Sequence, residues 1–128
     1  MAAPTPRGAL IIPILHTGSC HCGRIAFEVE GDLTEAKECN CTHCSRKGYL
    51  LWFVPREKLR LKTAEDALAT YQFNKHVISH HFCPHCGCAP LATGTGPGGA
   101  RMAAVNVRCL EDIDLATVKR VFVDGRSR

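Results

Sequence analysis

Eight of the nine cysteines in this chain fall into three short clusters, which is a pattern typical of zinc ligands. The clusters are "CHC" (Cys20, Cys22), "CNCTHC" (Cys39, Cys41, Cys44) and "CPHCGC" (Cys83, Cys86, Cys88). Two cysteines separated by one or two residues can both face one ion, because a tight turn brings their sulfur atoms together. The spacing therefore favours metal sites, and zinc is the ion that it favours most.

The number of ligands decides what such a site can do. A structural zinc is closed by four protein ligands, whereas a catalytic zinc has three and keeps one position for water or substrate. If "CHC" and the "CPHC" part of the last cluster form one closed site, the central cluster keeps three thiolates and an open position. Three thiolates leave the zinc site negatively charged, so that it activates water weakly and accepts a thiol substrate. In the alternative, Cys88 closes the central site, both zincs are structural, and the protein is a binding module.

Histidines lie close to these clusters in the sequence. We interpret His21, His43 and His85, which stand between cysteines, as solvated residues that point away from the ion. His80 and His81 come just before the last cluster in a predicted strand, where successive side chains face opposite sides. Either of them could reach a metal site as a proton shuttle, because histidine titrates near neutral pH; an exposed strand histidine is the simpler interpretation.

Strand patterns dominate the rest of the chain. In "RIAFEVE" the side chains of Ile25, Phe27 and Val29 alternate with more polar neighbours, as in a half-buried strand. The continuous apolar run "YLLWFVP" suits a strand buried on both faces, and further strand candidates are "LATYQF", "VISHHF", "MAAVNVR" and "KRVFV". Helical signals are restricted to single turns in "TAEDALATY" and "LEDIDLATV", and "ATGTGPGGAR" (92–101) has the composition of a surface loop. The sequence predicts a mainly β protein with few short helical turns.

Composition and charge restrict the class of protein further. With 128 residues, 45% hydrophobic and 22% charged, the chain suits a single globular domain over 1–128. We expect its core at about 17–123, after a short extended segment at 1–16. The net charge of +4 comes from scattered basic residues, which argues against nucleic acid as a partner. The short apolar stretch at 9–15, broken by Pro13, suits neither a secretory signal nor a membrane span. We therefore expect a cytoplasmic protein whose cysteines stay reduced.

Four stretches of the sequence together resemble one known family. The order "GSCHCGRIAFEVE", "CNCTHCSRKG", "FCPHCG" and "AVNVRCLEDIDL" is similar to that of the glutathione-dependent formaldehyde-activating enzymes, a family that includes the centromere protein V-like proteins. The resemblance runs from about Thr17 to the "FVDG" near the C-terminus, and this chain resembles the short forms. It implies a sandwich-like fold of small β-sheets stitched together by zinc.

The resemblance also implies metal ligands and an activity. Carried over to this sequence, it gives two zinc ions per chain: a structural zinc held by Cys20, Cys22, Cys83 and Cys86, and a catalytic zinc held by Cys39, Cys41 and Cys44. The founding activity of the family is the condensation of formaldehyde with glutathione to S-(hydroxymethyl)glutathione, a carbon–sulfur lyase reaction when written in reverse. In such a mechanism the zinc orients the thiolate or polarises the carbonyl group.

Three further residues are candidates for the remaining catalytic roles. His81 could protonate the developing alkoxide, while Arg46 and Lys47, beside the central cluster, could hold a substrate carboxylate. The expected partner is a small molecule, glutathione or another thiol, and the apolar neighbours Tyr49, Leu51 and Trp52 suit a less polar substrate. Two other functions remain open: hydrolysis of an imine or another carbonyl adduct at the open metal position, and a non-catalytic zinc-scaffolded binding module.

Overall fold

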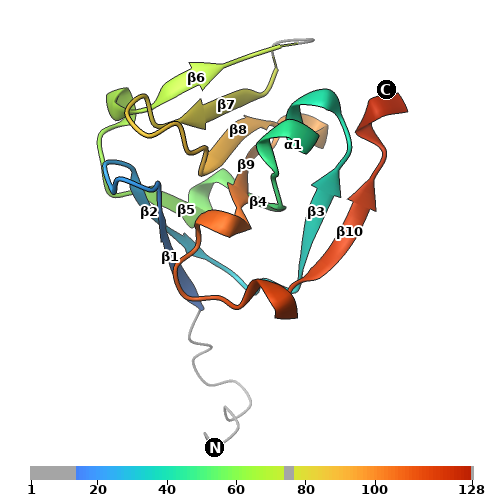
Figure 1. The fold of residues 1–128 in the computed structure, drawn as a ribbon, viewed down its shortest axis with the longest axis horizontal. Helices are drawn as coiled ribbons and strands as arrows, with labels where there is room; N and C mark the ends of the chain where they lie inside the picture. Colours follow the sequence, from blue (N-terminus) through green and yellow to red (C-terminus); the bar gives the residue numbers. More distant parts are fainter. Residues whose placement is uncertain (1–13, 74–76, 128) are drawn as a thin grey trace, which may run out of the picture.

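The structure is a computed structural model that describes residues 14–73 and 77–127. Within these residues, ten strands, one short α-helix and six 3₁₀ turns follow one another along the chain (Figure 1). The strands are β1 (Leu15–Ser19), β2 (Ala26–Glu30), β3 (Glu35–Cys39), β4 (Leu51–Pro55), β5 (Leu59–Leu61), β6 (Ala69–Tyr71), β7 (Ser79–Phe82), β8 (Leu91–Thr95), β9 (Arg101–Asn106) and β10 (Lys119–Val123). The helical elements are α1 (Thr42–Lys47), η1 (Arg56–Lys58), η2 (Glu65–Ala67), η3 (Pro97–Gly99), η4 (Val107–Cys109), η5 (Leu115–Thr117) and η6 (Gly125–Ser127).

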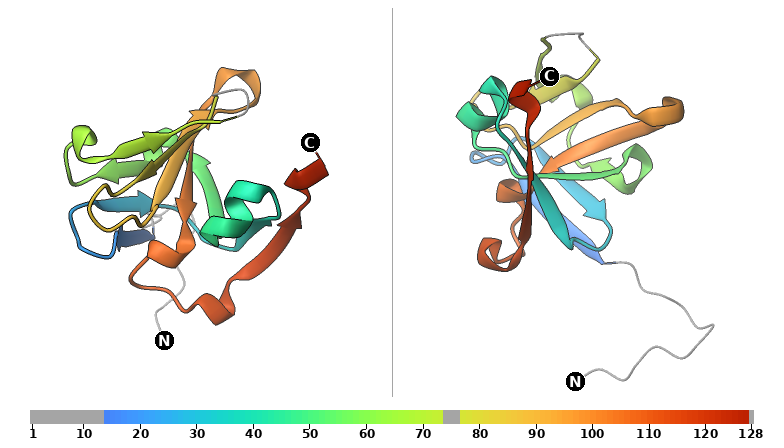
Figure 2. Two further views of the ribbon diagram at one scale, coloured as in Figure 1. Left: turned by 45° about the horizontal axis from the view of Figure 1, so that its top comes forward. Right: turned by 90° about the vertical axis from the view of Figure 1, so that its right-hand side faces the viewer.

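The strands form two sheets. The smaller sheet has the order β1-β2-β5, and the larger has the order β10-β3-β4-β9-β8-β7-β6. Neighbouring strands are antiparallel except at one edge of the large sheet, where β10 runs parallel to β3. The views in Figures 1 and 2 place α1 and the end of β10 side by side at this edge. The last described residues are thereby brought next to the central cysteine cluster.

The main core draws its side chains from both sheets. In β2 the side chains of Phe27 and Val29 are fully buried between half-buried neighbours, which is the predicted alternation. They pack in one cluster with Leu59 of β5 and with Trp52 and Val105 of the large sheet. Burial of one such side chain stabilises a fold by roughly 1.5–3 kcal/mol, so this cluster holds the two sheets together.

Strand β4 separates this core from a second, smaller cluster. Trp52 and Val54 belong to the main core, whereas Leu51 belongs to the cluster that contains Cys44. Towards the end of β4 the face opposite the main core is exposed to solvent, and Phe53 is 51% exposed. The apolar run is therefore buried on both faces only in its first part.

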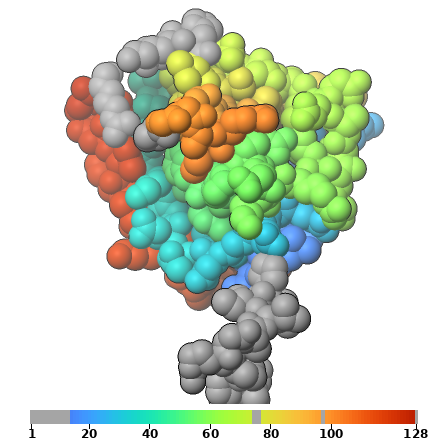
Figure 3. All heavy atoms as spheres, turned by 180° about the vertical axis from the view of Figure 1, so that it is seen from behind, coloured from blue at the N-terminus to red at the C-terminus, as the bar shows by residue number. Residues whose placement is uncertain are grey.

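The predicted mainly β fold with few short helices is confirmed, and single turns η2 and η5 lie inside the two predicted helical stretches. The prediction of a surface loop at 92–101 is wrong, because β8 occupies most of its first half and pairs with both β7 and β9. Gly98 and Gly99, with φ of 74° and 80°, make the turn of this hairpin, seen in orange from behind in Figure 3. The missed strand is thus defined by its neighbours.

The predicted N-terminal extended segment falls largely outside the described residues. Residues 1–13 are not described, and Leu15 and His16 already belong to β1. Among the residues with a described position, no helix is long and apolar enough to cross a membrane.

Candidate metal centres

Four cysteine side chains from two distant parts of the chain converge on one point. The Sγ atoms of Cys20, Cys22, Cys83 and Cys86 all lie within 4.8 Å of one another. Sγ of Cys22 is 3.7 Å from that of Cys20 and 3.6 Å from that of Cys83. Zinc–sulfur bonds of about 2.3 Å in a tetrahedron require sulfur atoms roughly 3.8 Å apart. This four-cysteine group therefore has the donors and the spacing of a closed four-thiolate zinc site.

Two tight turns position the four-cysteine group. One follows β1 and the other follows β7, and each contains a glycine directly after its second ligand: Gly23 with φ of 83° and Gly87 with φ of 81°. A residue with a side chain adopts such positive φ values only with strain. The backbone N–H of Ile25 donates to Sγ of Cys20 at 3.3 Å and so orients this sulfur. Since β1 belongs to the small sheet and β7 to the large one, a metal held here would join the two sheets.

Hydrogen bonds favour the thiolate form of two of these ligands. Backbone hydrogen bonding from Cys88 and Cys22 lowers the pKa of Cys86 to about 5. Hydrogen bonds from the backbone and the side chain of Arg24 lower the pKa of Cys22. Because the thiolate is the form that binds zinc, both effects favour metal binding at neutral pH.

The central cluster forms a second group with three members. The Sγ atoms of Cys39, Cys41 and Cys44 lie within 4.8 Å of one another, and no fourth ligand atom from the described part of the chain joins them. Cys39 ends β3, Cys41 is the N-cap of α1, and Cys44 lies in the first turn of this helix. The backbone N–H of Cys44 donates to Sγ of Cys41 at 3.2 Å, as at a serine or aspartate N-cap. This three-cysteine group also fits a zinc ion, with one ligand fewer.

Cys88 packs beside the four-cysteine group. It contacts the small cluster of Cys20, Ile25 and Cys83, and its carbonyl oxygen accepts a hydrogen bond from the backbone N–H of Cys83 at 2.9 Å. Among the described residues it belongs to neither set of converging sulfur atoms. The geometry therefore gives no support to the alternative in which Cys88 closes the three-cysteine group.

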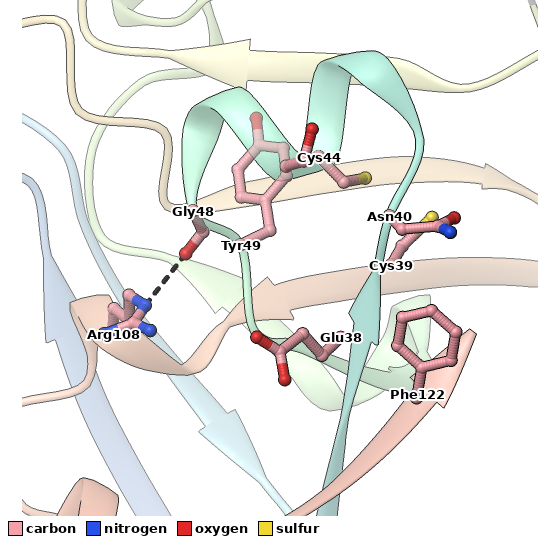
Figure 4. Close-up of a pocket in the computed structure, with 9 residues that line it drawn as sticks. Glu38, Cys39, Asn40, Cys44, Gly48, Tyr49, Arg108 and Phe122 are labelled. Atoms are coloured by element: carbon pink, nitrogen blue, oxygen red, sulfur yellow. Dashed lines mark hydrogen bonds between the residues drawn. The ribbon is translucent and has the colours of Figure 1, made fainter. Parts of the chain in front are cut away.

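A cavity of about 340 Å³ adjoins the three-cysteine group (Figure 4). Its walls come from β3, α1 and the residues after it, η4 and β10, and they consist of Glu38, Cys39, Asn40, Cys44, Ser45, Gly48, Tyr49, Arg108 and Phe122. In Figure 4 the sulfur atoms of Cys39 and Cys44 lie on the same side of the site. A small molecule in this cavity would therefore lie next to any metal that the three-cysteine group holds.

Two charged residues in the cavity wall were not among the sequence-based candidates. Arg108 follows β9 and donates through Nε to the carbonyl oxygen of Gly48 at 2.8 Å, which fixes the guanidinium at the cavity (Figure 4). Glu38, which directly precedes Cys39 in the sequence, also lines the cavity. Arg108 is 60 residues from Gly48 in the sequence, so only the fold brings it to the site. The sequence does contain one indication of the role of Glu38, which is its position directly before the ligand Cys39.

Arg46 and Lys47 lie in the last turn of α1, outside the cavity wall. Arg46 donates through Nη1 to the carbonyl oxygen of Thr42 at 3.1 Å. The Nζ atom of Lys47 stands 5.4 Å from the centre of the Phe82 ring. Both residues remain on the element that carries Cys44, but neither side chain lines the cavity.

His81 and His80 face opposite sides of β7, as the strand pattern predicts. The ring nitrogens of His81 pair with the hydroxyl groups of Thr70 at 3.0 Å and Thr93 at 2.8 Å, and the residue lines a different cavity. His80 instead packs against His43, with 4.4 Å between ring centres, and stacks on Tyr49 at 6.1 Å. Of the two histidines, His80 is the one that faces the surroundings of the three-cysteine group.

We expect the buried His80 to make stability dependent on pH. Burial, together with the nearby His43, His81 and Lys47, lowers the pKa of His80 from 6.5 to about 4. The unfolded chain takes up this proton near pH 6.5, so between pH 6.5 and pH 4 it binds more protons and acid favours unfolding. Lowering the pH from 7.5 to 5.5 should reduce the free energy of unfolding by about 1 kcal/mol through this residue.

Urea unfolding of the wild-type chain and of His80→Phe at these two pH values measures this term. Subtraction of the two pH dependences removes the contribution of the cysteine ligands, which both proteins share. An equal loss of stability in both proteins would show that His80 does not carry the pH dependence.

The two sheets and two cysteine groups define this chain as a small, mainly β protein with two centres suited to metal ions. Residues 15–124 match the family model of the glutathione-dependent formaldehyde-activating enzyme, and the chain belongs to this family. It is also similar to the crystal structure of a Rhodobacter sphaeroides protein, with 29% sequence identity and a TM-score of 0.70. That alignment covers 82% of this chain and 99% of the other. The resemblance inferred from the cysteine pattern is confirmed.

Proposed function

We propose that the chain is a zinc-dependent enzyme of the carbon–sulfur lyase type, which acts on the thiol adduct of a small aldehyde in the manner of an S-(hydroxymethyl)glutathione synthase. The observation that carries this proposal is the cavity of about 340 Å³ in whose wall Cys39 and Cys44 of the three-cysteine group lie. The membership of the chain in a formaldehyde-activating family supports the same chemistry. A binding module would need no cavity at its metal.

The proposed reaction forms one bond between a thiol sulfur atom and a carbonyl carbon atom. The thiol loses its proton, the carbonyl oxygen gains one, and the reverse reaction breaks the same carbon–sulfur bond. A zinc ion held by Cys39, Cys41 and Cys44 would supply Lewis acidity and a template for the thiol. The chain itself would hold the rest of the substrate, with Arg108 binding a carboxylate and Glu38 binding an ammonium group. Glutathione carries both of these groups.

The proton donor remains a prediction. His81 was the candidate from the sequence, and in the structure its two ring nitrogens pair with threonine hydroxyl groups in another cavity. Glu38 lies in the wall of the proposed site and is a second candidate for proton transfer, as an alternative to its role as the ligand of the ammonium group, because a carboxyl group that donates a proton cannot at the same time bind that group as a carboxylate. Comparison of the pH–rate profiles of His81→Gln and Glu38→Gln with that of the wild type distinguishes the two candidates. Only removal of the true donor abolishes the part of the profile in which the rate changes with the ionisation of that group.

Two measurements test the proposed function. Protein with two zinc ions per chain should accelerate the approach of formaldehyde and glutathione to their adduct, in proportion to its concentration, as followed by NMR exchange. Zinc K-edge absorption should give an average below four sulfur atoms per zinc, rising when glutathione is added. An unchanged rate together with four sulfur atoms throughout would contradict the proposal and support the binding module.

We expect the Arg108→Met substitution to weaken substrate binding. A charge-assisted hydrogen bond contributes roughly 1.5–3 kcal/mol, so its loss should raise KM for glutathione about tenfold or more. If the carboxylate is held equally in the ground state and the transition state, kcat should change little. Steady-state kinetics with varied glutathione measure both constants.

Arg46→Met and Lys47→Met are the matched controls, because each removes one positive charge from outside the cavity wall. Both should leave KM within about twofold of the wild type, because neither side chain lines the cavity and exposed charges that make no direct contact interact weakly through water and salt. A large rise in KM for either control, with none for Arg108→Met, would instead support the carboxylate sites inferred from the sequence.

A further inference from the structure

The C-terminal segment, residues 123–127, lies against the three-cysteine group. Strand β10 is parallel to β3, and its last residue, Val123, is in register with Cys39. The chain continues from there into η6 and so passes beside the turn that carries Cys39 and Cys41. Figure 1 shows this end of the chain next to α1.

Asn40, between the ligands Cys39 and Cys41, is bound to this segment through three hydrogen bonds. Its backbone N–H donates to the carbonyl oxygen of Val123 at 3.1 Å. Its side-chain Nδ2 donates to Oδ1 of Asp124 at 3.0 Å, and its Oδ1 accepts from the backbone N–H of Arg126 at 2.9 Å. The conformation of the ligand turn is therefore coupled to the position of the C-terminal segment.

Gly125 is the residue of the C-terminal segment that lies against Cys39 and Cys41. A Cβ atom at this position would lie 2.5 Å from Sγ of Cys39 and 3.4 Å from Cβ of Cys41. Carbon and sulfur atoms in van der Waals contact lie well beyond 3 Å, so the sulfur or the segment would have to move. Gly125 is not among the described glycines with positive φ, so its backbone conformation is open to other residues. The need for glycine here is a matter of space beside a metal ligand.

We propose that Gly125 is a positioning residue of the three-cysteine metal centre. Because it has no side chain, residues 123–127 can hold Asn40 while Sγ of Cys39 keeps its place beside the sulfur atoms of Cys41 and Cys44. This inference rests on the proposed function only in that the three-cysteine group binds a metal. Gly125 acts through Cys39 and touches neither substrate nor metal.

Gly125→Ala tests the proposal through metal affinity. The added methyl group should push Sγ of Cys39 aside and lower the affinity of the three-cysteine centre about tenfold or more, as loss of groups that support a metal ligand commonly does. Titration with Co²⁺ in place of zinc measures the two centres by their thiolate-to-cobalt absorption. The four-cysteine centre should bind Co²⁺ with the affinity of the wild type. Only the binding step of the three-cysteine centre should show a lower affinity.

Gly94→Ala is the matched control, because a Cβ atom there would meet no atom closer than 3.5 Å. It should leave both titration steps unchanged. If Gly125→Ala does not fold, Asn40→Ser takes its place: it removes the side-chain bonds to Asp124 and Arg126 and should weaken the same step. Wild-type affinity at both centres in Gly125→Ala, or in Asn40→Ser when that variant is used, would overturn the proposal. An inactive wild type with a weakened step in Gly125→Ala would overturn the enzyme and leave this inference standing.

Discussion

Replacement of Cys83 by serine is expected to unfold the chain. Cys83 is fully buried, and its sulfur belongs to the group that links the turn after β1 to the end of β7. Structural zinc contributes roughly 10 kcal/mol or more to the folding of small domains, while a whole domain is stable by about 5–15 kcal/mol. Loss of one thiolate from this centre therefore removes a large share of the net stability. Circular dichroism, thermal melting and zinc content of the purified variant measure the result.

Cys88→Ser is the matched control for this prediction. Cys88 lies in the same turn and packs against the same small cluster, but its sulfur is outside the converging set. The control should fold, bind two zinc ions per chain and melt within a few degrees of the wild type, as expected for a change of about 1 kcal/mol or less. A folded Cys83→Ser chain with the melting temperature of the wild type would show that the four-cysteine group is not structural.

Much of the fold could be predicted because local alternation determines several strands. The pattern in β2 places Phe27 and Val29 inside, and β10 coincides with the predicted "KRVFV". Strands β3 and β8 could not be predicted in this way. Strand β3, with sequence "EAKEC", buries only Ala36 fully, and β8 contains Gly94 and two threonines. Each lies between two partner strands, so pairing outweighs a weak local preference.

The metal ligands could be grouped from the sequence, whereas the rest of the site could not. Ligand spacing is a local property, and a turn of two or three residues is enough to bring two sulfur atoms together. The surroundings of the metal depend on contacts between distant parts of the chain. Arg108 reaches Gly48 because β9 pairs with β4, and Gly125 reaches Cys39 because β10 pairs with β3. No periodicity in the sequence encodes such a parallel edge pairing. The side chains that would hold a substrate are therefore found only in the folded structure.

Replacement of Cys41 by serine is expected to remove activity while the chain stays folded. Cys41 is the N-cap of α1, and its sulfur accepts a hydrogen bond from the backbone N–H of Cys44. Serine is among the preferred N-cap residues and can accept the same bond, so the helix should keep its start. Only the thiolate is lost, which leaves two ligands in a centre that had three. The variant should contain about one zinc per chain and melt within a few degrees of the wild type.

The expected loss in adduct formation for Cys41→Ser is about a hundredfold or more, because loss of the metal removes both its Lewis acidity and its template effect. Zinc content, thermal melting and the NMR exchange rate are measured on the same sample, beside Cys83→Ser and Cys88→Ser. The contrast between Cys41→Ser and Cys83→Ser is the decisive comparison, since both lose one thiolate from a cysteine group of similar spacing. Equal destabilisation would mean that both centres hold the fold together and that the division into a structural and a catalytic zinc is wrong. A folded, active Cys41→Ser chain would place the reaction elsewhere in the molecule.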